Sequence, residues 1–230
     1  MTRQQEDYIP PLRYHWLTHF YDPVVRLSTR EKAFKQALLR QAAPRAGDQV
    51  LDLGCGTATL TIALAKAYPM ATVTGIDADA SALAIARGKS RDSALDLDFR
   101  QAISTGMPLP DESFDRVVSS LFFHHLTTAQ KSATLAETRR VLKPGGELHI
   151  ADWGKSSNAL MRALFLGVQL LDGFETTRDS VAGALPGLLR AAGYEGVEET
   201  AKFDTPLGTM RLLRAARPRV PPSRGSAVSP

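Results

Sequence analysis

Residues 52–59 contain the densest grouping of side chains and backbone that could bind a ligand. The run Asp-Leu-Gly-Cys-Gly-Thr starts at Asp52, where a predicted strand ends. Gly54 and Gly56 let the backbone turn sharply and approach a ligand at the start of the next helix. A dinucleotide-binding turn would have a further glycine at position 59, where this chain has Thr59. Because the Asp52 carboxylate would repel a phosphate and suits an amino group, the turn favours a cationic ligand without a pyrophosphate.

Asp77 follows the next predicted strand and is a second candidate ligand-binding residue. A carboxylate at that place can accept hydrogen bonds from both hydroxyls of a ribose and repels a 2′-phosphate. An isolated Asp after a strand is more often the cap of a helix, a role that Asp79 could fill here. Together with the glycine turn, Asp77 favours a ligand that carries a ribose.

These residues lie in an alternation of short apolar stretches and helical patterns that begins at residue 49. Such an alternation is typical of βαβ units that build a parallel sheet. We predict strands at 49–53, 71–76, 96–100, 114–121, 147–152, 197–203 and 208–215. Helices are predicted at 57–68, 80–89, 128–142, 160–171 and 180–192. The last two strands could form an antiparallel hairpin at the edge of the sheet.

Four segments in the same order resemble the successive motifs of class I S-adenosylmethionine-dependent methyltransferases. They read VLDLGCGTATLTIALA, VTGIDADASALAIAR, MPLPDESFDRVVSSLFFHHL and RRVLKPGGELHIADW, and they cover about residues 49–152. The branch that they resemble includes the ubiquinone/menaquinone biosynthesis C-methyltransferases. The resemblance implies an α/β fold, a Rossmann-like three-layer sandwich. Its seven-stranded, mostly parallel sheet would have the order 3-2-1-4-5-7-6, with only the last strand antiparallel.

The resemblance also implies a cofactor, S-adenosylmethionine, lying across the carboxyl ends of the first two strands. Asp52 would organise its ammonium group and Asp77 its ribose, with Ala78 against the adenine. The methionine portion would lie along Gly54, Cys55 and Gly56.

The adenine end departs from the family pattern. Ile103 takes the place where the family usually has an Asp that bonds the adenine amino group. We therefore expect apolar packing by Ile103, backbone groups near Ser104 and a weaker affinity for the cofactor. Ser120, at the end of the fourth strand, is assigned to the same site, and no metal is expected.

The pair His124-His125 follows the fourth strand, and Asp152 ends the fifth on the same rim. Methyl transfer from a sulfonium is an in-line displacement, so the protein mainly aligns the reactants and keeps the pocket dry. An imidazole has a suitable pKa for a general base near neutrality. Small-molecule O-methyltransferases of the superfamily are similar here, which implies one histidine as base and Asp152 as its partner. Either histidine could instead cap the next helix or pack under a lid.

Two segments are expected to close the site. Residues 1–30 form an aromatic lid segment in which Tyr21, together with His125, would contact the substrate. Tyr21-Asp22 resembles a pair in the quinone C-methyltransferases, although their following residues do not match Pro23-Val24-Val25. Residues 156–193 would be lid helices, and the run 160–171, apolar nearly all round, suits a lid, a homodimer interface or the core.

The composition fits a single domain. The chain has 230 residues, 43% hydrophobic and 23% charged, which is ordinary for one buried core. The methyltransferase domain would span 31–216, followed by a flexible tail at 217–230 that lacks apolar periodicity. The lone cysteine excludes an internal disulfide, and the absence of a signal-like segment or membrane span favours a cytoplasmic protein.

We therefore expect an enzyme that methylates a small, apolar molecule at oxygen, carbon or nitrogen. One alternative is a sensor that binds S-adenosylmethionine without transferring its methyl group. A nucleic-acid methyltransferase, suggested by the +4 net charge, would have an Asn/Asp-Pro-Pro-aromatic motif where this chain has Ser119-Ser120-Leu121-Phe122. No nucleic-acid partner is therefore expected.

Overall fold

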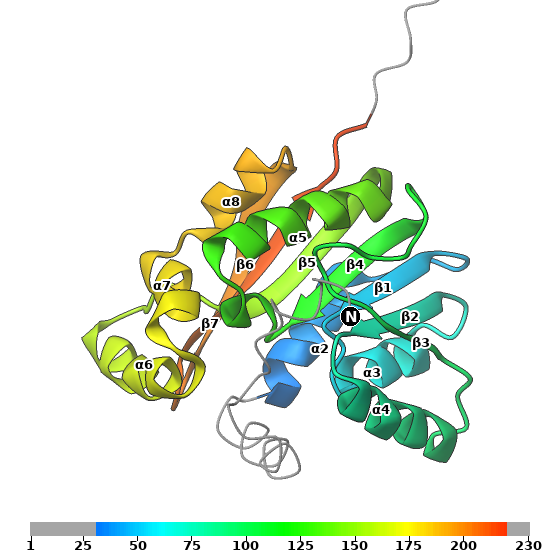
Figure 1. The fold of residues 1–230 in the computed structure, drawn as a ribbon, viewed down its shortest axis with the longest axis horizontal. Helices are drawn as coiled ribbons and strands as arrows, with labels where there is room; N and C mark the ends of the chain where they lie inside the picture. The colour runs from blue at the N-terminus through cyan, green and yellow to red at the C-terminus, as the bar shows by residue number, and fades with distance from the viewer. Residues whose placement is uncertain (1–30, 220–230) are drawn as a thin grey trace, which may run out of the picture.

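The structure is a computed structural model that describes residues 31–219. The seven strands form one sheet with the order β3-β2-β1-β4-β5-β7-β6 (Figure 1). Only β7 runs antiparallel to its neighbours, β5 and β6. The predicted fold is therefore confirmed. The strands are β1 (Gln49–Leu53), β2 (Thr72–Asp77), β3 (Asp98–Gln101), β4 (Phe114–Ser120), β5 (Leu142–Trp153), β6 (Glu195–Thr205) and β7 (Gly208–Ala216).

Helices cover both faces of the sheet. One face carries α2 (Glu31–Ala42), α3 (Thr59–Ala67) and α4 (Ala80–Asp92), and the other carries α5 (Thr128–Val141) and α8 (Leu185–Ala191) (Figure 1). The central strand β4 is apolar on both faces, with Val117 and Val118 fully buried, as expected of a parallel strand between two layers. Val117 belongs to the core beneath α5 and α8, and Val118 to the core beneath α2 and α3.

The structure corrects the predicted helix at 180–192. The chain forms α7 (Phe174–Ala182) and α8 as separate helices. Gly183 stops α7 in the left-handed region, with φ at 69°, and Pro186 lies in the first turn of α8, where a missing backbone N–H costs nothing. β5 begins at Leu142, earlier than predicted, because Leu142 already pairs with Phe114 of β4. The register then shifts across the Pro-Gly-Gly segment before Glu147 pairs with Arg116.

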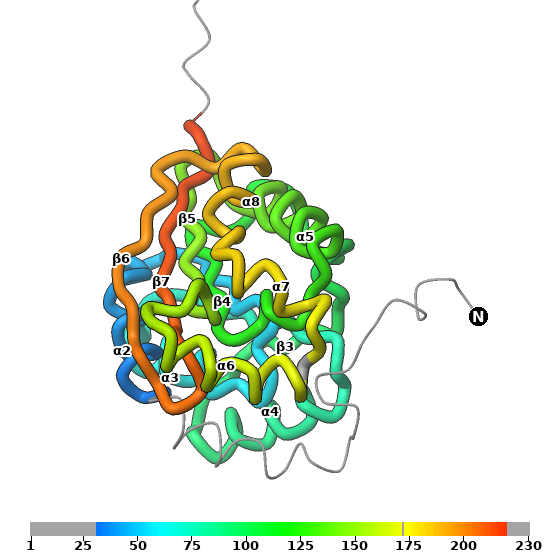
Figure 2. The backbone as a smooth tube through the Cα atoms, turned by 90° about the vertical axis from the view of Figure 1, so that its left-hand side faces the viewer, coloured from blue at the N-terminus to red at the C-terminus, as the bar shows by residue number. Residues whose placement is uncertain are grey.

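The apolar helix α6 (Ala159–Asp172) packs against β7 and α7 (Figure 2). Met161, Phe165 and Val168 are buried, and Phe165 lies 5.7 Å from Trp153 between ring centroids. The opposite side exposes apolar side chains, which include Leu170, 74% exposed, and Leu171, 68% exposed. Neither α6 nor any other helix of the described part is long and apolar enough to cross a membrane.

The folded chain continues past the predicted domain end. Arg217 donates through Nη1 to the carbonyls of Arg139, Arg140 and Leu142, and its backbone pairs with Gly145 and Gly146. Arg217 is therefore part of the folded domain. The predicted tail beyond 219, the aromatic segment 1–30 and its Tyr21 lie outside the described residues.

Candidate active site

The glycine turn after β1 is fixed from two sides. The amides of Gly54 and Cys55 both donate to the carbonyl of Ile76, at 2.9 Å each. These two hydrogen bonds attach the turn to the end of β2. Gly54 has φ at 71°, and a Cβ there would lie 2.3 Å from Cδ2 of Phe122. Gly56 also has a positive φ but has open space around its Cα. Only glycine therefore fits at position 54, because both the backbone and the close approach of Phe122 require it.

Asp77 joins this turn to the end of β2. Its Oδ2 accepts from the Gly56 amide at 2.8 Å, and its Oδ1 accepts from the Asp79 amide at 2.9 Å. Asp79 caps α4 by accepting from the amides of Ser81 and Ala82. The capping role that Asp77 could have had is thus filled by Asp79, and the Asp77 carboxylate stays oriented beside the glycine turn. Burial raises its pKa, and the two amides oppose that effect.

Asp52 lies deeper than the turn. It is 1% exposed, and its Oδ2 accepts from Thr61 Oγ1 at 2.7 Å. Burial raises its pKa to about 6, with the Thr61 hydrogen bond acting in the opposite direction. Burial likewise raises the pKa of the Cys55 thiol. Cys55 therefore stays protonated and is no nucleophile. A cation near Asp52 would stabilise its buried, ionised carboxylate.

The residues predicted to bind the adenine lie on three segments of the chain. The side-chain amide of Gln101 donates a hydrogen bond to the backbone carbonyl of Ala78 at 3.0 Å. The hydroxyl of Ser104 is 2.7 Å from Thr134 Oγ1 on α5, and Ile103 is half-buried in the same loop. The Ser120 Oγ is buried, and no partner for it occurs among the described residues. A buried hydroxyl without a partner is unfavourable, so Ser120 suits a site that a polar ligand completes.

Asp152 at the end of β5 organises the turn that carries the histidines, the short helix η3 (Phe123–His125). Its Oδ1 lies 2.6 Å from His124 Nδ1 and accepts from the Trp153 amide at 2.7 Å. Its Oδ2 accepts from the amides of Phe122, at 3.1 Å, and His124, at 3.3 Å. The strand register places β4 and β5 side by side, with Ser120 opposite Ala151, which brings the two segments together.

The pair of His124 and Asp152 has a defined protonation pattern. Burial alone would raise the pKa of Asp152, but the charge and hydrogen bond of His124 outweigh it, and the pKa lies below its usual value. An ionised Asp152 only accepts hydrogen bonds, so His124 Nδ1 carries the proton between them. In neutral His124 the proton-accepting nitrogen is then Nε2. The predicted partnership of one histidine with Asp152 is present, and that histidine is His124.

His125 has different surroundings. It is partly exposed, and its ring centroid lies 3.9 Å from that of His124. Burial and the neighbouring His124 lower its pKa well below the usual value. His125 is consequently neutral near pH 7 and contributes no fixed charge to the rim.

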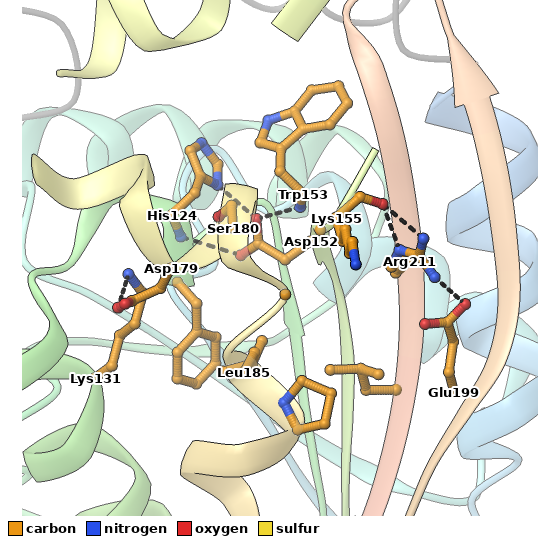
Figure 3. A pocket seen from close by; sticks show the side chains of 15 residues that line it. His124, Lys131, Asp152, Trp153, Lys155, Asp179, Ser180, Leu185, Glu199 and Arg211 are labelled. Atoms are coloured by element: carbon orange, nitrogen blue, oxygen red, sulfur yellow. Dashed lines mark hydrogen bonds and ion pairs between the residues drawn. The ribbon is translucent and has the colours of Figure 1, made fainter. Parts of the chain in front are cut away.

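A cavity of about 170 Å³ borders the pair of His124 and Asp152 (Figure 3). His124 and Asp152 lie on one side of it. Its apolar wall comes from Phe123, Trp153, Leu185, Pro186 and Leu213, and charged side chains of Lys155, Glu199 and Arg211 also line it. Arg211 is already engaged, since it donates to the Lys155 carbonyl and pairs with Glu199. Within residues 31–219, no three acidic, histidine or cysteine side chains gather as a metal site.

Sequence reasoning missed several residues of this region. Phe122, which lies against Gly54, resembled any apolar residue after a strand. Lys131 and Asp179 form a buried ion pair at 2.9 Å, although a Lys on an amphipathic helix normally indicates the solvent face. Gln169 on α6 is 4% exposed, and its Oε1 has no partner among the described residues. No sequence signal marks these four residues, because only tertiary contacts decide their surroundings.

Known methyltransferases resemble this chain in sequence. The family "Methyltransferase domain" matches residues 50–146. An uncharacterized methyltransferase of Synechocystis sp. is 33% identical over 194 residues, which cover 81% of this chain and 86% of that protein. The ubiquinone/menaquinone biosynthesis C-methyltransferase UbiE of Bdellovibrio bacteriovorus is 34% identical over 132 residues, 57% of this chain and 55% of that enzyme. The match therefore spans little more than half of the Bdellovibrio enzyme.

Solved structures show the same fold. An S-adenosylmethionine-dependent methyltransferase from Methanosarcina mazei has a TM-score of 0.62 and 23% identity, over 77% of this chain and 95% of that one. The S-adenosylmethionine-dependent methyltransferase SibL, in its apo form, has a TM-score of 0.68 and 24% identity, over 82% of this chain and 56% of that one.

Proposed function

Since this chain belongs to the S-adenosylmethionine-dependent methyltransferases, we propose that it methylates a small, apolar molecule with His124 as the general base. The observation that carries this proposal is the 2.6 Å contact between His124 Nδ1 and Asp152 at the carboxyl edge of the sheet. It orients the ring and leaves Nε2 to accept a proton. The same edge carries the glycine turn and Asp77, where the cofactor would bind.

The residues present fit S-adenosylmethionine. Gly54 lets the turn pack closely against Phe122, the space beside the Gly56 Cα is open, and the oriented Asp77 carboxylate suits two ribose hydroxyls. The buried Asp52 would favour the ammonium group of the cofactor, and a polar atom of the cofactor would give the buried Ser120 Oγ a hydrogen-bond partner. When bound, the cofactor supplies a methyl group on a sulfonium that is already a good leaving group.

The protein's part is alignment, exclusion of water and removal of one proton. His124 Nε2 would take the proton from a hydroxyl or an acidic carbon as the acceptor attacks the methyl carbon. The ionised Asp152 stabilises the imidazolium that results, because it lies at hydrogen-bond distance in a buried site. His125, neutral beside His124, would contact the acceptor without opposing that charge.

The acceptor class is supported by the relatives. The Bdellovibrio relative is a quinone-biosynthesis C-methyltransferase, and phenolic or quinol acceptors need the deprotonation that His124 would provide. A screen should measure release of S-adenosylhomocysteine with quinols, catechols, sugars and amines. We expect turnover with an aromatic hydroxyl compound. A blank with every class, despite tight cofactor binding, would instead favour a sensor without transfer activity.

Separate His124→Asn and His125→Asn substitutions test the base. We expect His124→Asn to slow turnover at least about 100-fold, in the range of general-base contributions, with the cofactor Kd nearly unchanged. His125→Asn should change mainly the KM of the acceptor. Wild-type turnover in the His124 variant would discard the role. Binding of RNA or DNA at low salt, where phosphate contacts are strongest, would reopen the nucleic-acid alternative.

A further inference from the structure

A buried lysine lies outside the residues assigned to the reaction. Lys131 of α5 is 2% exposed, and its ammonium donates three hydrogen bonds. They reach the carbonyl of Leu126 at 2.8 Å, the carbonyl of Thr176 at 2.8 Å, and Asp179 Oδ2 at 2.9 Å. One cation therefore joins three segments of the chain: α5, the residue after His125, and α7. Figure 3 shows its ion pair with Asp179.

The ion pair has more polar partners than a contact that only stabilises the fold would need. Asp179 Oδ2 also accepts from Thr128 Oγ1 at 2.9 Å, so a polar cluster is buried between α5 and α7. Burying a lysine and a carboxylate costs desolvation energy, and well-packed apolar side chains of similar volume often stabilise a fold equally or more. What the pair provides that apolar residues would not is a fixed geometry between the three segments.

The histidine turn is held at both ends by this arrangement. Asp152 binds the amides of Phe122 and His124 from the β5 side. Lys131 binds the carbonyl of Leu126, at the other end of the turn. Asp179 lines the cavity beside His124, and α7 packs against η3, so the same ammonium joins a wall of the cavity to the histidine turn.

We propose that Lys131 is a positioning residue, which couples α7, a wall of the cavity, to the turn that carries His124 and His125. This inference rests on the proposed function, since it concerns the alignment of the base with the acceptor. Removing the ammonium would free the turn at Leu126 and let α7 move relative to His124. Cofactor binding at the glycine turn would change little.

The test compares Lys131→Met with the double variant Lys131→Met/Asp179→Leu. The single variant should lose thermal stability, because Asp179 is left as a buried, unpaired carboxylate. The double variant should regain most of the melting temperature while kcat stays at least about tenfold low, with KM for the acceptor raised and the Kd of S-adenosylmethionine within a factor of about two. Lys143→Met, which removes a half-exposed ion pair with Asp115, is the matched control. It should lose little thermal stability and leave kcat, the KM of the acceptor and the Kd of S-adenosylmethionine unchanged.

A second readout needs no acceptor. In protein labelled at its histidines, the NMR signals of the His124 and His125 rings should move or broaden in both Lys131 variants, but not in Lys143→Met. If the double variant does not fold, Asp179→Asn keeps the shape of the pair and should still displace these signals. A folded double variant with wild-type kcat and unchanged histidine signals would overturn the proposal. A wild-type protein that releases no S-adenosylhomocysteine would refute the proposed function alone, since the NMR comparison would still report the coupling.

Discussion

Replacing Asp52 with Asn should stabilise the unliganded protein near neutral pH. Asp52 is 1% exposed, and its burial raises the pKa to about 6. At pH 7.5 the fold must therefore carry a buried charge that it disfavours. The Asn side chain has no charge to desolvate, and its oxygen can still accept the hydrogen bond from Thr61 Oγ1.

The magnitude follows from the displaced pKa. A change from the ordinary value of 3.8 to about 6 corresponds to about 3 kcal/mol of folding free energy. The folded pKa is raised, so this cost is absent below about pH 4, where Asp52 is protonated in both states. The cost grows as the pH rises from about 4 to about 6 and is constant above that range. At pH 7.5 the urea midpoint of the variant should thus be higher by about 1 M.

Urea unfolding of both proteins at pH 7.5 and pH 4 measures this difference. Subtracting the wild type from the variant at each pH removes the contribution of other carboxylates, such as Glu147, whose pKa is lowered to about 2. The variant should also bind S-adenosylmethionine less tightly at pH 7.5, since the ammonium loses its counter-charge. A variant less stable than wild type at pH 7.5, or an equal difference at both pH values, would refute the reasoning.

Four further substitutions test the rest of the site. Asp152→Asn should destabilise the fold by about 3–5 kcal/mol, because an amide cannot accept all the hydrogen bonds that the buried carboxylate receives; an unchanged unfolding midpoint would contradict this. Gly54→Ala should cost about 2–5 kcal/mol through its positive φ and the collision with Phe122, whereas Gly56→Ala should cost only about 1–2 kcal/mol, and equal effects in chemical denaturation would remove the steric argument. Asp77→Ala should weaken S-adenosylmethionine binding at least about tenfold by calorimetry, and an unchanged Kd would show that Asp77 does not hold the ribose.

Tertiary contacts decided features that the sequence left open. The two histidines were open alternatives in the chain, and the structure pairs His124, not His125, with Asp152. This choice depends on how β4 packs beside β5, which no local pattern specifies. The cap of α4 by Asp79 could be predicted from the sequence, because its partners, the amides of Ser81 and Ala82, are close in the chain. The break at Gly183 in the predicted helix 180–192 was missed because an isolated Gly is tolerated inside a helical pattern.

The sequence by itself determined the fold and predicted where the cofactor would bind. Strand and helix periodicity is a local property, and the glycine turn must follow β1 because its backbone has to bend where the strand ends. Only the tertiary structure decided which buried groups face one another, such as Lys131 with Asp179. Transfer of a lysine side chain from water to the protein interior is unfavourable unless polar partners receive it. The burial of Lys131 therefore cannot be predicted before α5 and α7 are packed together.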